Sequence, residues 1–170
     1  MKTSGQPRWL DQDERAAWVA FVGVFARLPV ELDRQLRRDA GISMFDYRVL
    51  ATLSEATDRT LRMSDLAFIA DGSLPRLSQV VTRLEKLGWI QRTPDPTDGR
   101  YTLALLTQSG LAKVVDAAPG HLEAVRRLVI DPLGATHIRQ LNTISRRIGN
   151  AIAEEAPRQN SGAPIAPIRQ

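Results

Sequence analysis

The stretch that decides the fold lies at residues 74–110 and reads LPRLSQVVTRLEKLGWIQRTPDPTDGRYTLALLTQSG. Its first half has the apolar spacing of an amphipathic helix that stops at Gly88. Ser73 is well suited to cap this helix, and Pro75 falls in the first turn, where its missing N–H costs nothing. The residues predicted to share the inner face are Leu74, Leu77, Val80, Val81, Leu84 and Leu87.

The opposite face of the same helix is polar and partly basic. It carries neither Asp nor Glu and consists of Pro75, Arg76, Ser78, Gln79, Thr82, Arg83 and Lys86. Residues 73–92 hold four basic side chains against one acidic, a net charge of +3, whereas residues 61–106 reach only +1. The sequence therefore predicts a small, local basic surface of the kind that attracts phosphates.

Two runs rich in aliphatic, aromatic and β-branched residues follow at 89–93 and 101–106, separated by the polar segment PDPTDGR. This pattern predicts a β-hairpin with a polar tip. An Asp-Gly pair such as Asp98-Gly99 is common in hairpin turns because of its backbone geometry alone. This role is compatible with contact between the next residue, Arg100, and a binding partner.

Three long helices flank this stretch, as judged from apolar residues at spacings of three, four and seven. They are expected at residues 11–38, 108–129 and 135–153. Pro29 should kink the first helix, because it removes a backbone donor and clashes with the preceding turn, and Gly41 should end it. Thr107 should cap the second helix, which Pro119-Gly120 should bend or break.

Two shorter helices are predicted between the first long helix and residue 74. Ser43 and Asp46 have the spacing of a capping box for one of them. A loop at 56–61 then leads to a short helix at 65–70, with Ser64 as its cap. The predicted order is four helices, a hairpin and two helices, a mainly α fold with a small β-hairpin wing.

The composition is that of one globular domain. The 170 residues carry a net charge of +4 and 43% apolar residues, with no Cys, which excludes disulfides, thiolate metal sites, cysteine nucleophiles and thiol redox sensing. No stretch is long and apolar enough to span a bilayer, and the N-terminus does not resemble a signal peptide, so we expect a cytoplasmic protein without a membrane partner. We expect no cofactor and no metal.

Both ends are polar and rich in Pro, Gly or small residues. We therefore expect disordered tails at 1–8 and 157–170 around a single ordered domain at 9–156. Within it, a winged helix-turn-helix at about 43–106 lies between candidate dimerisation helices at about 11–40 and 108–154. The geometry suits DNA, because the major groove admits one helix and a neighbouring hairpin can reach the backbone or the minor groove.

The chain resembles the multiple-antibiotic-resistance regulator (MarR) family over residues 9–153. Three motifs carry the resemblance: the Arg/Ser/Thr-bearing helix that ends in LEKLGW, the wing tip DPTDGR, and a strand ending in LT that two residues separate from Gly110. The resemblance implies a homodimeric transcriptional regulator, most simply a repressor, that binds double-stranded DNA at a pseudo-palindromic operator. It implies no enzymatic activity.

The resemblance also implies roles for individual residues. The helix would place Pro75, Arg76, Ser78, Gln79, Thr82, Arg83 and Lys86 at the major groove or its flanking phosphates, with Ser73 capping the helix near a phosphate. Arg100 would enter the minor groove, held by the Asp98 carboxylate.

Dimerisation would pair two such modules roughly 34 Å apart, one turn of DNA. Apolar stripes on the first and last helices exceed what a small winged domain can cover. The candidate interface residues are Trp18, Val22, Phe25, Ile138, Leu141, Ile144, Ile148 and Ile152. The alternative is that these stripes pack only within one chain.

Members of the family often bind small aromatic or anionic molecules between the dimerisation helices and the winged module. Trp18, Arg48, His121 and Arg126 are the residues this sequence offers for such an effector pocket, although they have no diagnostic spacing. A lone histidine such as His121 is more often a packing or surface residue.

Two other function classes compete with DNA binding. An enzyme is disfavoured because His121 and His137 are the chain's two histidines and no phosphate-binding Gly-rich loop, HExxH motif or nucleophile elbow accompanies them. A protein-binding winged helix is disfavoured because Arg76, Gln79 and Arg83 make the exposed helix face polar, whereas protein interfaces are more apolar and aromatic.

Overall fold

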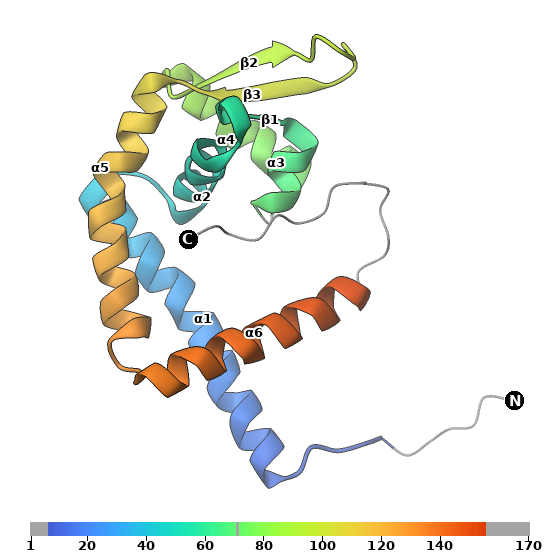
Figure 1. Cartoon of the computed structure of the whole chain (residues 1–170), viewed down its shortest axis with the longest axis vertical. Coiled ribbons are helices and arrows are strands. Elements are labelled where there is room, and N and C mark those ends of the chain that lie inside the picture. Colours follow the sequence, from blue (N-terminus) through green and yellow to red (C-terminus); the bar gives the residue numbers. More distant parts are fainter. Residues whose placement is uncertain (1–6, 71, 156–170) are drawn as a thin grey trace, which may run out of the picture.

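The computed structural model describes residues 7–70 and 72–155 (Figure 1). The tails expected at 1–8 and 157–170 lie outside these residues, apart from residues 7 and 8. The elements are α1 (Gln12–Ala40), α2 (Met44–Glu55), a 3-10 turn (Thr57–Arg59), β1 (Thr60–Arg62), α3 (Met63–Ile69), α4 (Leu74–Lys86), β2 (Ile90–Pro94), β3 (Thr102–Leu106), α5 (Gln108–Val125), a π turn (Arg126–Ile130) and α6 (Ala135–Glu155). The mainly helical fold with a small β wing is confirmed.

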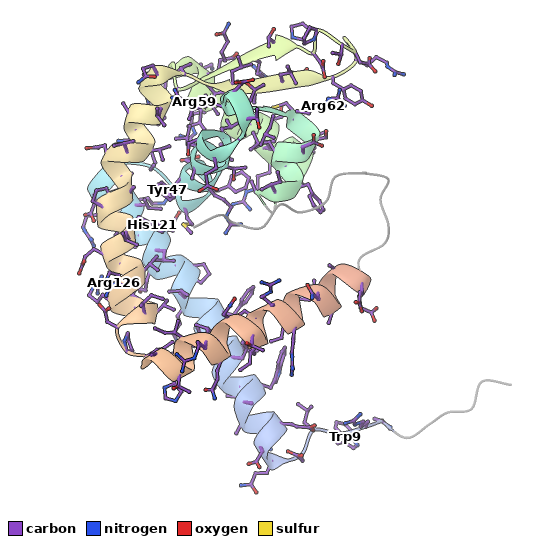
Figure 2. All side chains as sticks on the ribbon, viewed as in Figure 1. Trp9, Tyr47, Arg59, Arg62, His121 and Arg126 are labelled. Carbon is purple, nitrogen blue, oxygen red and sulfur yellow. The ribbon has the colours of Figure 1, made fainter. Side chains whose placement is uncertain are left out.

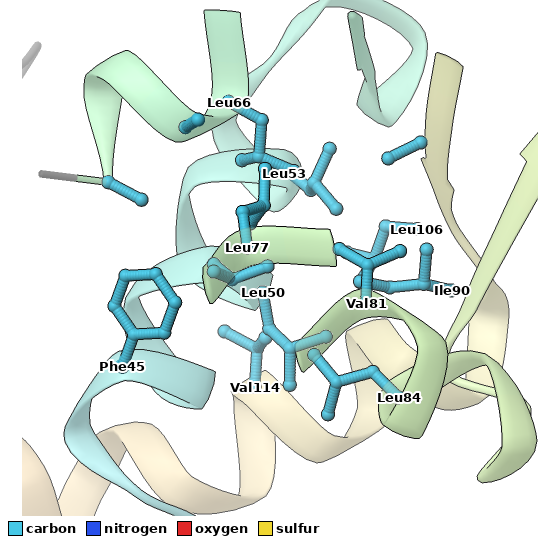
Figure 3. Packing of buried hydrophobic residues seen from close by; sticks show 14 residues of the cluster. Phe45, Leu50, Leu53, Leu66, Leu77, Val81, Leu84, Ile90, Leu106 and Val114 are labelled. Atoms are coloured by element: carbon cyan, nitrogen blue, oxygen red, sulfur yellow. The ribbon is translucent and has the colours of Figure 1, made fainter. Parts of the chain in front are cut away.

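The winged module consists of α2, α3, α4 and the sheet, closed on one side by the start of α5 (Figure 1). Its core contains side chains from all of these elements (Figure 3), among them Phe45, Leu50, Leu53, Leu66, Leu77, Val81, Leu84, Ile90, Leu106 and Val114. From α4 only Leu77, Val81 and Leu84 are buried. Leu74 and Leu87 were expected in the core but are 51% and 50% exposed. They lie at the two ends of α4, whereas the core covers only the middle of the helix.

The sheet has three antiparallel strands in the order β1-β3-β2. The hairpin prediction is confirmed by β2 and β3, but the loop expected at 56–61 is wrong in part, since Thr60 begins β1. Thr60 pairs with Leu105, and Arg62 pairs with Leu103. A three-residue strand has too little periodicity to be recognised locally, and it forms here because β3 offers it a free edge.

Most of the predicted helix caps are confirmed. Ser43 and Asp46 form the expected capping box, and Ser73 and Thr107 accept from the backbone of their helices. The cap expected at Ser64 is wrong: α3 already begins at Met63, and the Ser64 hydroxyl lies 3.3 Å from an Asp65 carboxylate oxygen. Gly41 ends α1 in the left-handed conformation, with φ of 67°.

The long helices continue through their prolines. α1 runs through Pro29 as one helix. A bend or a break was expected at Pro119-Gly120; the break is wrong, because α5 continues to Val125 and the irregular segment is the π turn that follows it. Gly120 instead marks a close approach to α1, since a Cβ there would lie 3.2 Å from the Gln35 amide nitrogen.

Two of the long helices, α1 and α6, are buried only in small part within the chain. The helix α1 contacts α2 and α5. The buried residues of α1 are Leu32, Gln35 and Leu36, all in its C-terminal half, and α6 buries none. Within residues 7–70 and 72–155, no helix combines the length and the apolar character needed to cross a membrane.

Candidate nucleic-acid interface

The helix α4 presents its polar face on the surface of the winged module. Ser73 caps its N-terminus, its hydroxyl oxygen 3.4 Å from the Arg76 amide nitrogen. Pro75, Arg76, Gln79, Arg83 and Lys86 are exposed, whereas Ser78 and Thr82 are half-buried. The predicted set of residues therefore forms one continuous surface opposite the buried Leu77, Val81 and Leu84.

The two arginines of α4 are engaged by the N-terminal end of α2. The Arg83 guanidinium forms an ion pair with Asp46, a carboxylate that is 2% exposed and also accepts from the Ser43 amide. The Arg76 guanidinium lies 4.3 Å from the centre of the Phe45 ring. Sequence reasoning found both arginines but not these partners, which lie about 30 to 37 residues away in the chain.

A second ion pair fastens α4 to the wing. The Glu85 carboxylate accepts from Nε and Nη2 of Arg92 on β2 at 2.9 and 2.6 Å, and from the Arg92 amide at 3.1 Å. These hydrogen bonds lower the pKa of Glu85. Arg92 was counted in the local positive charge, but it pairs with Glu85 and so links α4 to the sheet.

The wing tip carries the expected pair of Asp98 and Arg100. Nε of Arg100 lies 3.0 Å from Oδ1 of Asp98, and Nη2 lies 2.7 Å from Oδ2. The hydrogen bonds from Arg100 lower the pKa of Asp98. The Arg100 side chain is nonetheless 84% exposed, so the carboxylate orients a guanidinium that still faces solvent.

The wing tip also contains a buried carboxylate that sequence reasoning did not identify. Asp95 is 6% exposed and accepts from the hydroxyl and amide of Thr97 at 2.6 and 2.8 Å, and from Arg62 of β1 at 2.8 Å. These contacts lower the pKa of Asp95 to about 2. Arg62 also lies 4.4 Å from the Tyr101 ring centre. The spacing Asp-x-Thr was the available signal, because Asp commonly accepts from the residue two positions later in a turn.

The candidate dimer stripes are largely exposed in the single chain. Trp18 and Phe25 on α1 are 57% and 72% exposed, and Ile144 and Ile152 on α6 are 54% and 65% exposed. The other predicted members range from half-buried to exposed: Val22, Ile138, Leu141 and Ile148. Phe21, which was not predicted, has its ring centre 6.3 Å from those of both Trp18 and Phe25.

The four candidate pocket residues contact different parts of the molecule. Arg48 donates to the Ala70 carbonyl at 3.2 Å, and Arg126 pairs with Asp131 at 2.9 Å. His121 lies against Tyr47, with ring centres 4.6 Å apart, while Arg126 lies further along the chain, at the start of the π turn that follows α5 (Figure 2). Burial lowers the pKa of His121, and its Nδ1 has no hydrogen-bond partner among residues 7–70 and 72–155.

Together, α3 and α4, the sheet and the protruding Arg100 define a winged helix-turn-helix of the DNA-binding class. A model of the MarR family matches residues 40–100. Sco3205, a MarR family transcriptional regulator from Streptomyces coelicolor solved in complex with DNA, is 38% identical; the match covers 90% of this chain and 94% of that one, with a TM-score of 0.83. AbsC, a MarR family transcriptional regulator from the same organism, is 34% identical; the match covers 88% of this chain and 100% of AbsC, with a TM-score of 0.82.

Among curated proteins, the HTH-type transcriptional regulator MhqR of Bacillus subtilis is 27% identical over 110 residues, which cover 64% of this chain and 73% of MhqR. The chain belongs to the MarR family. It is a DNA-binding transcriptional regulator and not an enzyme, as the sequence motifs predicted.

Proposed function

We propose that the chain is a homodimeric repressor that binds a pseudo-palindromic operator. The helix α4 enters the major groove, and Arg100 enters the adjacent minor groove. The observation that carries this proposal is the pairing of an exposed polar α4 face with a wing guanidinium that is 84% exposed and oriented by Asp98. The likeness to Sco3205, which was solved with DNA, supports it.

The exposed apolar stripes support the homodimer. A helix such as α6, with four large aliphatic side chains that are 36–65% exposed and no buried residue, is not stable as a solvated single helix. A second copy of the chain would cover these residues together with the aromatic residues of α1. Two copies would also supply the two recognition helices that a palindromic site requires.

We further propose that a small aromatic or anionic effector lowers operator affinity. His121 Nδ1 and Gln35 Oε1 are buried polar atoms without a hydrogen-bond partner in the part of the chain that the structure describes, and both lie where α5 approaches α1. His121 also contacts Tyr47 of α2 in the winged module. An effector at this junction would act if it preferred one spacing of the two recognition helices over another.

The test is a mobility-shift assay with the DNA upstream of the chain's own coding region, at two salt concentrations. Binding that weakens steeply with salt supports phosphate contacts, because neutralising phosphates releases counterions. A reporter behind the same DNA should be less active when the protein is present; an increase would refute the repressor role. Aromatic acids added to the assay should reduce the shift, and an unchanged shift with all of them would count against an effector of this class.

A further inference from the structure

The outward face of α4 is defined by the contacts on its two sides. At 100° per residue, Leu77, Val81 and Leu84 point inward, and the residues opposite them are Pro75, Gln79, Thr82 and Lys86. One flank contains Arg76 and Arg83, which contact α2, and the other contains Leu74, Ser78 and Glu85.

The arginines on the first flank are poorly placed to recognise bases. Arg83 cannot turn outward without leaving the buried Asp46 carboxylate with the Ser43 amide as its remaining partner. Arg76 would have to leave the face of the Phe45 ring, a contact that favours a cation. The commonest specific contact to guanine is a bidentate one from Arg to O6 and N7, and this helix holds both of its arginines away from that role.

Of the side chains that remain, Lys86 is the last residue of α4, away from the N-terminal end through which a recognition helix contacts bases, and the residues nearer that end have the chemistry of A·T recognition. The Gln79 amide can donate to N7 and accept from N6 of adenine, and it is exposed in the second turn of α4. Leu74, 51% exposed at the N-terminal end, adjoins Pro75 and gives the tip of the helix an apolar surface. Apolar side chains contact the thymine methyl group, which cytosine lacks in the major groove.

We propose that α4 recognises A·T base pairs in each half-site, with Gln79 bound to adenine and Leu74 against a thymine methyl, while Arg76 and Arg83 position the helix. This inference rests on the proposed function, because it specifies which bases the same helix contacts. It also gives Leu74, which the hydrophobic pattern placed in the core, a role at the surface.

The experiment uses the full chain and the upstream duplex that it binds, with single base analogues in one half-site. 7-deazaadenine lacks the N7 acceptor, and deoxyuridine lacks the thymine methyl. One 7-deazaadenine position should weaken binding by about 2- to 12-fold, the equivalent of one of the two hydrogen bonds in the bidentate contact. One deoxyuridine position should weaken it by about fourfold, the equivalent of one buried methyl group.

Variants assign these effects to residues. In Gln79→Ala the 7-deazaadenine effect should disappear, and in Leu74→Ala the deoxyuridine effect should disappear. Gln140→Ala, which changes an exposed glutamine on α6, should keep both effects. The analogue measurements on the unaltered chain stand even if a variant does not fold.

The contrary result is equally specific. If 7-deazaguanine weakens binding and Arg76→Ala or Arg83→Ala removes that sensitivity, guanine recognition by arginine is established and the inference is wrong. Absence of binding to the unmodified duplex and to randomised DNA would instead refute the proposed function. The two failures are therefore distinguishable.

Discussion

The ion pair between Arg83 and Asp46 offers a prediction that the structure makes quantitative. Breaking a fully buried pair by removing one partner costs about 3–5 kcal/mol. Here the Asp46 side chain is 3% exposed, but that of Arg83 is 49% exposed, so water reaches the pair from one side. The Ser43 amide also still donates to Asp46 in the variant. We therefore expect Arg83→Ala to lower the free energy of unfolding by about 1–3 kcal/mol.

The assay is urea unfolding followed by circular dichroism at one fixed protein concentration, because the stability of a dimer depends on concentration. The expected loss corresponds to a fall in Tm of about 3–10 °C for a chain of this size. Adding Asp46→Asn to Arg83→Ala should recover part of the loss, since the uncompensated buried charge is then removed. An Arg83→Ala protein of unaltered stability that loses discrimination at one base pair would refute the reasoning.

Three further predictions concern packing, pH and assembly. Gly110→Ala should lower the free energy of unfolding by about 3 kcal/mol, because a Cβ there would lie 2.1 Å from the Trp89 carbonyl oxygen. Burial lowers the pKa of His121 below 6.5, so the unfolded chain binds more protons at this residue; the contribution of His121 to stability, measured by urea unfolding against His121→Gln, should therefore fall as pH drops below about 6.5 and should level off below the folded-state pKa of His121. Ile144→Asp should give a monomer in sedimentation experiments at micromolar concentration, because it places a carboxylate in the exposed apolar stripe of α6.

Each of these predictions has a matched control. Gly149→Ala, where no atom lies within 4 Å of the added Cβ, should be neutral or stabilising. His121→Gln should reduce the fall in stability between pH 7 and 5, and an unchanged slope would contradict the assignment to this residue. Asn150→Asp adds the same charge on the side of α6 opposite the stripe and should leave the dimer intact. Equal behaviour of Asn150→Asp and Ile144→Asp would show that the stripe is not the interface.

Local signals in the sequence were sufficient for most of the fold. The caps at Ser43, Ser73 and Thr107 depend on residues three positions apart, and the helices depend on their own periodicity. β1 was missed because its stability comes from pairing with β3, more than 40 residues away. α5 was expected to bend or break at Pro119 and does not break there. Pro119 and Val115, the residue one turn earlier, are both exposed, so water is available to the carbonyl that lost its partner.

The candidate site was predictable as a set of residues but not as a set of contacts. The polar face of α4 follows from helical spacing alone. Which of its cations are tied down depends on Phe45 and Asp46, whose positions relative to α4 come only from the tertiary fold. For the same reason, Asp95 was read as part of a polar tip, whereas the fold buries it against Arg62.

The proposed function requires that α4 and the wing together bind operator DNA. The most direct measurement is the salt dependence of operator binding, by fluorescence anisotropy, for the unaltered chain, Arg100→Ala and Arg34→Ala. Arg34 is an exposed arginine on α1 that pairs with Glu31, so it controls for loss of one positive charge.

We predict that Arg100→Ala remains a folded dimer, binds the operator about 5- to 150-fold more weakly, and has a salt slope smaller by about one, whereas Arg34→Ala binds like the unaltered chain. Equal affinity and equal slope for all three proteins would contradict the claim.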